Sequence, residues 1–463
     1  MVFSSILFLF LFLIVALAGY YALPRKARNP WLFAVSLLFY GYGEPVFLFL
    51  MLGSITWNYV SGLLMARFWD SPRKKKAMLI ISVAGNLLAL GYFKYTGLLL
   101  DTLRNLPVFA FLPNPEIALP IGISFYTFQA MSYVIDVYWG NCGPQKNFIT
   151  FGTYVTLFPQ LIAGPIVRFV DVQEQLQTRQ ESLPLFHNGT KLFLVGLAKK
   201  VLLANPLGAL WGVLRTGDVG VLGAWTGVLA FTLQIYFDFS GYSDMARGLG
   251  NMFGFSFVKN FDYPYISRSI TEFWRRWHIS LGTWFREYVY IPLGGNRRGK
   301  ARQCLNLFIV WGLTGLWHGA SWNFVLWGLF FGVLLTLEKF LLAKPLGKAP
   351  RVLSHIYALL FIMLGWVIFD FADMSQMAAY FGKLLGLSGG WIGPAAVYPV
   401  VSHLPLLAVA IFACLPVGRR IYDRLTVTKT AWLWEAVGAA LILILCTASL
   451  VSSTYNPFLY FRF

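Results

Sequence analysis

Charged residues are scarce in this chain of 463 residues, since only 12% are Asp, Glu, Lys or Arg whereas 58% are hydrophobic. A soluble chain of this length would carry roughly a quarter of charged residues. The composition therefore excludes an ordinary soluble protein and predicts a polytopic membrane protein. The sequence contains no basic, aromatic-interleaved soluble module, so we expect no binding to nucleic acid.

Cysteine is also rare and scattered along the chain. The four cysteines form no C-x-x-C pair, and no histidine stands at metal-ligand spacing from them. We therefore expect neither a disulfide framework nor a zinc or other metal site. The G-x-S-x-G motif is missing as well, so the sequence does not predict a serine nucleophile elbow.

Acidic residues are the scarcer charge, with 19 Asp and Glu against 37 Lys and Arg and a formal net charge of +18. In a membrane protein this excess indicates cytoplasmic loops and contacts with anionic lipid headgroups. The basic loops 25–28 and 73–76 lie two predicted spans apart, so both are placed in the cytoplasm. Counting from the basic residues at 419–424 places the tail 454–463 outside, as it does the N-terminus.

Apolar runs of membrane length fill most of the chain. They predict an all-α polytopic membrane protein with about 11–13 transmembrane or re-entrant helices, folded as one domain over residues 1–463. Residues 1–23 lack a positive start, so we interpret them as a retained first span. The candidate spans are 3–23, 31–50, 52–69, 77–99, 117–139, 150–166, 190–210, 223–247, 303–317, 321–342, 352–370, 402–418 and 431–453.

Residues 270–288 carry the pattern of one amphipathic helix. Apolar side chains recur at steps of three and four and form a stripe about 120° wide, with His278 at its border. Tryptophans on one face and arginines on the other are typical of a helix in a membrane interface. A helix packed in the core is the alternative. The stripe consists of Ile270, Phe273, Trp274, Trp277, Leu281, Trp284, Phe285 and Tyr288.

Three further ionisable residues lie inside apolar sequence. His318 separates the apolar run 305–317 from a second run that ends at Leu337. Asp238 and Asp244 lie within the apolar segment 228–247. Ionisable groups at membrane depth are functional candidates, although each could instead form a structural bond to a neighbouring helix. Arg247 follows Asp244 at a helical spacing that predicts an ion pair.

Basic residues gather beside two glycines. Glycines allow backbone N–H groups to approach a phosphate, and clustered cations add electrostatic attraction. The segment therefore predicts either a site for the phosphates of a cofactor-like donor or an anchor on lipid headgroups. The cationic cluster, as we call it, consists of Arg297, Arg298, Lys300 and Arg302, which follow Gly294-Gly295.

Four stretches resemble the membrane-bound O-acyltransferase (MBOAT) superfamily. They are FWRRWHISLGTWFREYVYIPLGGNR, LWHG, DFSGYSD and the ending YNPFLYFRF. Within that superfamily the chain is similar, essentially end to end, to the branch of bacterial alginate and peptidoglycan O-acetyltransferase membrane subunits. The resemblance implies an MBOAT-like helix bundle with interfacial helices, a core motif region at 228–342, and a bacterial inner-membrane location with both termini periplasmic.

The same resemblance implies an O-acyltransferase that uses acetyl-CoA as donor and no tightly bound cofactor. Its product would be an O-acetylated extracytoplasmic polysaccharide, alginate first, with peptidoglycan and cellulose as alternatives. A periplasmic esterase-fold (SGNH-like) protein would be its partner. Transfer of a D-alanyl or fatty acyl group, or a secondary transporter, are the alternative readings.

The resemblance also assigns roles to individual residues. His318 takes the place of the catalytic histidine and would act as general base, while His278 matches a second motif histidine. Trp317 would line the substrate tunnel. Apart from the resemblance, the two aspartates of 228–247 are expected to line the same tunnel or to orient a histidine. Tyr460 matches a tyrosine thought to carry the acyl group in a small partner protein of the related D-alanylation system. An interfacial aromatic belt is the alternative for this tail.

Overall fold

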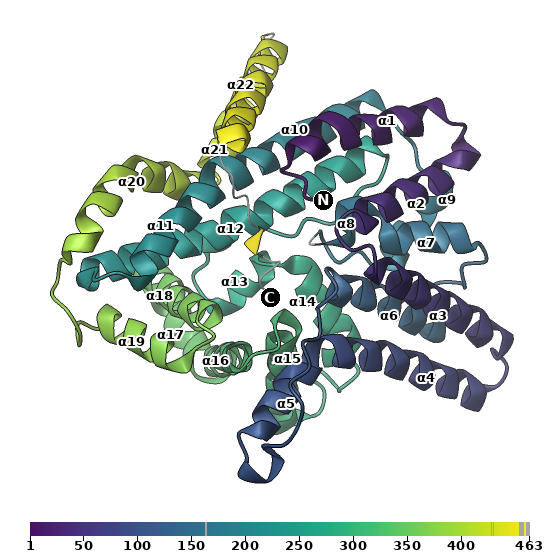
Figure 1. Ribbon diagram of the computed structural model, residues 1–463, viewed down its shortest axis with the longest axis horizontal. Coiled ribbons are helices and arrows are strands. Elements are labelled where there is room, and N and C mark those ends of the chain that lie inside the picture. Colours follow the sequence, from purple (N-terminus) through teal and green to yellow (C-terminus); the bar gives the residue numbers. More distant parts are fainter. Residues whose placement is uncertain (163, 427, 429, 453–457, 460–463) are drawn as a thin grey trace. The chain divides into compact units, whose positions relative to one another are not determined.

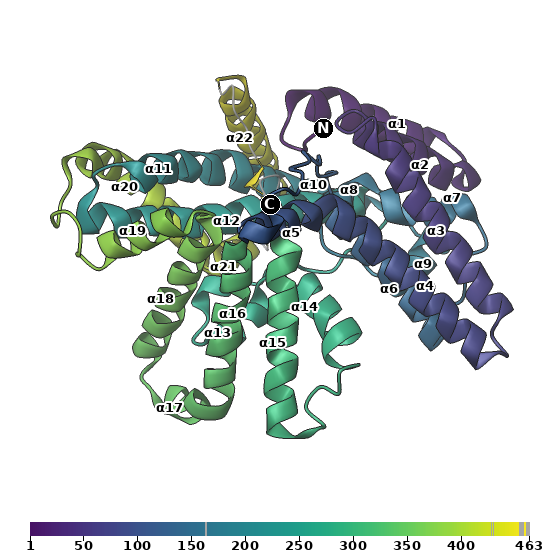
Figure 2. The same ribbon diagram turned by 60° about the horizontal axis from the view of Figure 1, so that its bottom comes forward.

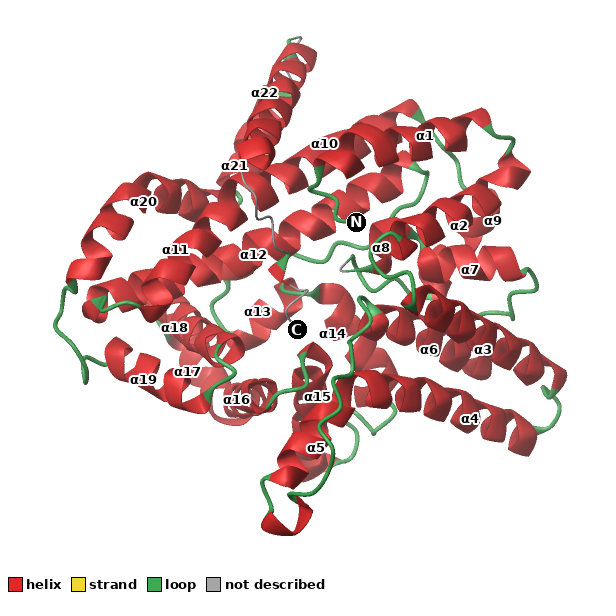
Figure 3. Ribbon diagram, viewed as in Figure 1, coloured by secondary structure: helices red, strands yellow, loops and turns green. Residues whose placement is uncertain are grey.

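The computed structural model describes residues 1–162, 164–426, 428, 430–452 and 458–459. This part of the chain consists of helices and connecting loops and contains no strand (Figure 3). Within it, eight helical stretches are long and apolar enough to cross a membrane, which confirms the all-α polytopic class. They are Phe47–Arg67, Pro72–Arg104, Leu183–Thr216, Gly220–Met252, Trp322–Lys348, Arg351–Asp370, Pro394–Ala413 and Ala431–Ser452.

The remaining predicted spans are helical but shorter or interrupted. Residues 3–23 contain a π-helical turn, Phe8–Phe12, followed by α1, Leu13–Ala22. Residues 150–166 contain α7, Phe148–Thr156, and the single turn α8, Phe158–Leu161. The chain bends at Leu157, two residues before Pro159, since proline is tolerated in the first turn of a new helix but not within a continuing one.

By its contacts the chain divides into two compact units. The first comprises residues 1–193 and 243–258, and the second comprises residues 194–242 and 259–463. The chain passes between them within α10, Leu183–Ala198, and within α12, Gly220–Met252. A single domain over the whole chain remains a prediction.

In the first unit, three helices pack side by side (Figure 1): α3, Phe47–Arg67; α4, Pro72–Leu90; and α6, Ile123–Trp139. Asn58 of α3 and Asn86 of α4 exchange amide hydrogen bonds of 3.0 and 2.8 Å. Each buried amide therefore has a hydrogen-bond partner, as polar groups in an apolar interior require. The unit also contains α2, Arg25–Gly41; α5, Thr96–Arg104; and α9, Phe169–Thr178.

In the second unit, α15, Gly299–His318, and α16, Trp322–Leu337, run antiparallel and in contact (Figure 2). Glycines allow this close approach: a Cβ at Gly315 would lie 2.2 Å from the carbonyl oxygen of Phe324, and one at Gly328 would lie 2.3 Å from that of Trp311. Small residues permit such backbone contacts between membrane helices. The pairing holds the last residue of α15, His318, against its neighbours.

Further helices complete the second unit. One of them, α18, packs against α16. They are α11, Asn205–Thr216; α13, Ile270–Arg276; α14, Ile279–Phe285; α17, Ala343–Lys348; α18, Arg351–Asp370; α19, Met374–Leu384; α20, Pro394–Ala413; α21, Val417–Leu425; and α22, Ala431–Ser452.

Candidate active site

The prediction of one continuous helix over 270–288 is wrong. The segment forms α13 and α14, and Trp277 and His278 lie in the break between them. His278 adopts a left-handed backbone with φ 47° and ψ 52°, a conformation that residues other than glycine rarely adopt. His278 therefore lies at a bend in the chain rather than at the border of a helical stripe.

Asn260 explains the break. Its backbone oxygen accepts the N–H of Ile279 at 3.0 Å. Its side-chain Oδ1 accepts the N–H of Ser280 at 3.1 Å and the Ser280 hydroxyl at 2.9 Å. The first N–H groups of a helix have no partner within that helix. Asn260 supplies those partners, so a new helix can begin directly after His278.

The apolar stripe of 270–288 is buried within the second unit. All of its members except Trp274 are buried, and Trp277, Leu281 and Trp284 are at most 4% exposed. The location in a membrane interface is therefore wrong for this face, and the core-packed alternative holds. The large apolar area removed from solvent or lipid by these rings stabilises the bend that carries His278.

A buried carboxylate fixes the start of α13. Glu338, which is 3% exposed, accepts the N–H groups of Ile270 and Thr271 at 2.5 and 2.8 Å and the Thr271 hydroxyl at 2.6 Å. A carboxylate at a helix N-terminus satisfies orphan N–H groups and complements the helix dipole. Sequence reasoning missed Glu338. Its place directly after the apolar run that ends at Leu337 was a usable signal, because acids at membrane depth are unfavourable.

The fold brings the two predicted histidines together. The ring centroids of His278 and His318 lie 6.5 Å apart, and the side chains are 2% and 6% exposed. Trp317 lies against both rings, at 5.8 and 5.1 Å respectively. Phe239 of α12 packs on His278 at 4.7 Å, and Trp327 of α16 packs on His318 at 5.0 Å. Both imidazoles are thus enclosed by aromatic rings.

This aromatic enclosure controls the protonation of His278. Its Nδ1 lies 3.3 Å from Oδ1 of Asn260. Desolvation by burial lowers the pKa of His278 to about 3, because a charged imidazolium is disfavoured away from water. His278 is therefore a neutral ring at physiological pH.

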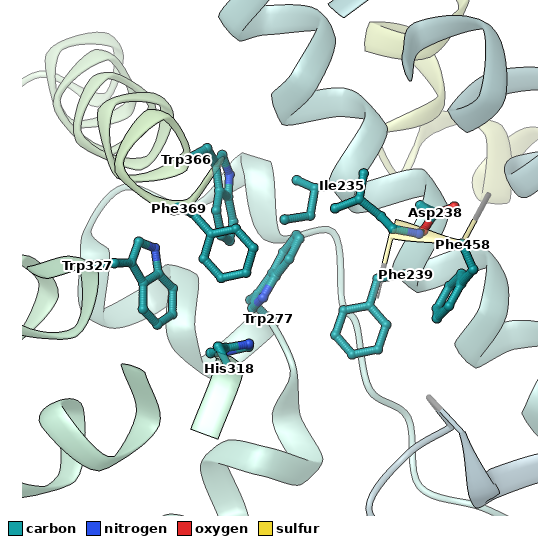
Figure 4. A pocket seen from close by; sticks show the side chains of 10 residues that line it. Ile235, Asp238, Phe239, Trp277, His318, Trp327, Trp366, Phe369 and Phe458 are labelled. Atoms are coloured by element: carbon teal, nitrogen blue, oxygen red, sulfur yellow. The ribbon is translucent and has the colours of Figure 1, made fainter. Parts of the chain in front are cut away.

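A small cavity adjoins His318 (Figure 4). Its volume is about 20 Å³, which is enough for a water-sized group. Its walls are mostly aromatic, and Asp238 supplies the carboxylate among them. The His318 cavity is lined by Ile235, Asp238, Phe239, Trp277, His318, Trp327, Trp366, Phe369, Phe458 and Leu459.

Two residues near the C-terminus form part of this cavity. Leu459 donates its backbone N–H to Oδ2 of Asp238 at 2.9 Å. Lys200 forms an ion pair with Oδ1 of the same carboxylate. Phe458 packs against Tyr242 with ring centroids 4.6 Å apart. Tyr460, the predicted acyl carrier, follows Leu459 in the sequence and lies outside the described residues.

The other predicted site residues are not among those that line the His318 cavity. Asp244 belongs to the first unit, where its ion pair with Arg247 at 3.5 Å confirms the predicted spacing. In the cationic cluster, Arg302 is half-buried and the other three side chains are exposed. The cluster lies at the start of α15, and His318 is the last residue of that helix. A helix of 20 residues is about 30 Å long, so the cluster is remote from the histidines.

The described ranges contain no group of three or more His, Cys, Asp or Glu side chains that could hold an ion. The four cysteines, Cys142, Cys304, Cys414 and Cys446, carry free thiols. What the geometry offers is a neutral, buried histidine beside a second buried histidine in aromatic surroundings. Such surroundings suit proton transfer to or from a reacting group with water excluded.

Comparison with known proteins gives the family of the chain. Residues 143–344 match MBOAT, the membrane-bound O-acyltransferase family. The chain is 40% identical to the probable alginate O-acetylase AlgI of Pseudomonas putida over 100% of both proteins. It is 31% identical to the peptidoglycan O-acetyltransferase of Helicobacter pylori over 100% of this chain and 98% of that protein. It is 25% identical to the teichoic acid D-alanyltransferase of Bacillus subtilis over 57% of this chain.

The helical multi-pass architecture and the family match define the class of protein as a membrane-embedded O-acyltransferase. The chain belongs to the membrane-bound O-acyltransferase family. Within it, the predicted similarity to the alginate and peptidoglycan O-acetyltransferase branch is confirmed.

Proposed function

We propose that this protein is the membrane subunit of a polysaccharide O-acetylation system in a bacterial inner membrane. It takes acetyl groups from cytosolic acetyl-CoA and passes them to the periplasmic side, where an SGNH-like partner protein transfers them to the polymer. Alginate is the first candidate polymer, because the relatives that match this chain over its full length include a probable alginate O-acetylase. The distribution of basic loops supports periplasmic termini.

The observation that carries the proposal is the C-terminal segment in the wall of the His318 cavity. Phe458 and Leu459 line this cavity together with His318, and Tyr460 is the next residue in the chain. The candidate carrier therefore follows directly in the chain after a residue that lines the same cavity as the candidate base. This supports Tyr460 as the group that receives acetyl from the donor and hands it to the partner.

The chemistry that follows is a double displacement. A phenol has a pKa of about 10, so it needs a base to become nucleophilic. His318 accepts the phenolic proton of Tyr460 as the oxygen attacks the acetyl carbon of the thioester. The carbon–sulfur bond breaks, and coenzyme A leaves with that proton as its thiol. In the second step a partner hydroxyl attacks the tyrosyl ester, and the released phenolate takes up the hydroxyl proton.

Coenzyme A would bind through its phosphates at the cationic cluster. Gly294 and Gly295 have φ values of 105° and 51°, which glycine adopts without a steric cost, so they shape a turn beside exposed arginines. The N-terminus of α15 adds its positive dipole end. A donor bound there must extend along most of the roughly 30 Å of α15 to bring its thioester to His318. Lipid headgroups are the competing ligand for the same cations.

The size of the His318 cavity bears on the length of the acyl group that the protein transfers. A volume of about 20 Å³ beside His318 favours a short acyl group over a fatty chain. A D-alanyl group is the second candidate, because a teichoic acid D-alanyltransferase is among the relatives. That relative covers a smaller part of this chain than the O-acetyltransferases do, which favours acetyl.

The test follows the label from radioactive acetyl-CoA in membranes that contain this protein. Wild-type protein should become acetylated on its C-terminal peptide by mass spectrometry, and Tyr460→Phe and His318→Ala should lose both this label and polymer acetylation. Tyr398→Phe is the matched control, because Tyr398 is 80% exposed, and it should behave as wild type. Full polymer acetylation by Tyr460→Phe would contradict the carrier role, and label from D-alanine instead of acetyl would favour the second candidate.

A further inference from the structure

We propose that Asn260 is a positioning residue that fixes His278 in the tautomer with its hydrogen on Nδ1, so that Nε2 accepts a hydrogen bond from the reacting hydroxyl group. The tautomer follows from contacts within the second unit alone. Only the identity of the hydroxyl group rests on the proposed function.

The orientation of the Asn260 amide is settled by its partners. Oδ1 lies 3.1 Å from the backbone nitrogen of Ser280. A backbone N–H can only donate, and the amide nitrogen of asparagine can also only donate. Exchanging Oδ1 and Nδ2 would therefore set two donors against each other, so the oxygen must face Ser280.

The same oxygen determines the tautomer of His278. Nδ1 lies 3.3 Å from it, within hydrogen-bonding distance for an N–H donor, although at the long end of the range. An oxygen that only accepts requires a hydrogen on Nδ1. A neutral imidazole carries one hydrogen, so Nε2 presents its lone pair. Burial, which lowers the pKa of His278 to about 3, keeps the ring in this neutral form.

Nε2 is the ring nitrogen of His278 that is left to accept a hydrogen bond from a ligand. It is buried, and none of the residues that the structure describes forms a hydrogen bond with it. A buried acceptor without a donor is destabilising. The ring of His318, 6.5 Å away between centroids, is too distant for a direct bond. An O–H group between the two histidines would satisfy Nε2.

This assignment restricts the chemistry of His278. A lone pair attracts a hydroxyl hydrogen and repels a carbonyl oxygen or an oxyanion. His278 therefore does not stabilise the oxyanion of the tetrahedral intermediate. Before reaction it holds the hydroxyl, that of the tyrosyl carrier or of the acceptor, by the single hydroxyl hydrogen. That hydrogen turns from Nε2 to His318 as the oxygen attacks, so His318 takes the proton.

Asn260 also holds the backbone of His278 in its left-handed conformation. A left-handed conformation is unfavourable for a residue other than glycine, and such strain persists where the surroundings hold it in place. The bonds from Ile279 and Ser280 to Asn260 do this on the C-terminal side of His278. Asn260 thus sets the position of the ring and its hydrogen together.

The tautomer is tested directly by ¹⁵N NMR on the full-length protein in lipid nanodiscs with labelled histidine. The chain has only 5 histidines, and His278→Asn identifies the signal by its loss. At pH 7 we expect a neutral ring with hydrogen on Nδ1. A hydrogen on Nε2, or a doubly protonated ring, would overturn the proposal. Asn58→Ala, which alters a buried asparagine of the first unit, is the control and should leave this signal unchanged.

Two variants separate positioning from simple structural support. Asn260→Ala should reduce the acetylation rate at least tenfold at every pH. Asn260→Asp keeps an oxygen that accepts from Ser280 and from Nδ1, but its charge favours the imidazolium and removes the Nε2 lone pair. Its activity should therefore fall toward acid, with the acidic limb shifted to higher pH than in wild type. Of the rings that face His278, those of Phe239, Trp317 and His318, only that of His318 is of an ionisable type. The shifted acidic limb is therefore assigned to His278 only if the ¹⁵N signal of His278 changes to the imidazolium form over the same pH range.

A purely structural role for Asn260 predicts a different outcome. Asn260→Asp would then retain the wild-type pH profile, which would contradict our proposal. If Asn260→Ala does not fold, the wild-type spectrum and Asn260→Asp still decide the question. Failure of the proposed function is distinguishable, because the tautomer is measured without any substrate. A confirmed tautomer combined with acetylation that is independent of Tyr460 would overturn the carrier alone.

Discussion

Leu459 donates its backbone N–H to Asp238 at 2.9 Å, although 221 positions separate the two residues in the sequence. The carboxylate also pairs with Lys200, so a buried charge is neutralised where the C-terminal segment attaches. Asp238 was expected to line a substrate tunnel. It does line the His318 cavity, and its contacts add a second role as the anchor of residues 458–459.

Removing this anchor should release the C-terminal segment. We expect that the double change Asp238→Leu and Lys200→Met speeds maleimide labelling of a Leu459→Cys reporter about fivefold, since one buried hydrogen bond contributes about 1 kcal/mol. Changing both partners avoids a buried unpaired lysine, and replacing a buried ion pair by apolar residues is often tolerated. The four native cysteines are replaced by alanine in all samples.

The control for this change is Asp244→Asn, which alters a carboxylate on the same helix α12 that pairs with Arg247. It should leave the labelling rate unchanged. Equal rates in the double variant and the control would mean that Asp238 does not hold the segment in place.

Glu338 should be required for both stability and activity. In Glu338→Gln, one of the two oxygens that accept the N–H groups of Ile270 and Thr271 becomes a donor. We expect a loss of about 1–3 kcal/mol, seen as a lower midpoint of thermal unfolding in detergent. Acetylation should fall at the same time, because α13 leads directly to His278. Glu287→Gln is the control: Glu287 is a surface residue whose nearest cation, Arg286, lies 3.7 Å away, and its loss should change little.

The cationic cluster should govern donor affinity in a salt-dependent way. Replacing Arg297, Arg298 and Lys300 by glutamine should raise the KM for acetyl-CoA several-fold and leave kcat nearly unchanged, because the cluster is remote from His318. The effect should shrink at high ionic strength, where exposed charges are screened. An unchanged KM with altered insertion into the membrane would favour lipid headgroups as the ligand.

The sequence predicted those features that depend on neighbouring residues. The apolar run before His318 became part of α15, and the helical spacing of Asp244 and Arg247 became an ion pair. The bend at His278 could not be predicted, because the residue that causes it, Asn260, lies 18 positions upstream. The amphipathic periodicity of 270–288 continues across the bend, so it gave no sign of it.

Contacts between residues that are still further apart in the sequence could not be predicted either, because neighbouring residues carry no sign of them. Glu338 binds the start of α13 from 68 positions away, and Leu459 reaches Asp238 across almost half the chain. Periodicity and composition report which face of an element is buried, but they do not report which distant element covers it. The pair of histidines was found through motif resemblance, while their aromatic enclosure came from the fold.

The burial of His278 should make the stability of the protein depend on pH. In the unfolded chain a histidine has a pKa of about 6.5, whereas burial lowers the pKa of His278 in the folded protein to about 3. Below pH 6.5 the unfolded state therefore binds a proton that the folded state does not. By linkage, the stability contributed by neutral His278 is present above pH 6.5 and is lost as the pH falls toward 3.

Between pH 7 and pH 5 this effect should amount to about 2 kcal/mol. His278→Asn cannot titrate, so its midpoint of chemical unfolding should fall less than that of wild type over the same interval, even if it starts lower. His187→Gln changes an exposed histidine and should follow the wild-type curve. Parallel pH dependences for His278→Asn and wild type would mean that His278 takes up a proton in the folded state, and that the aromatic rings around it do not exclude water.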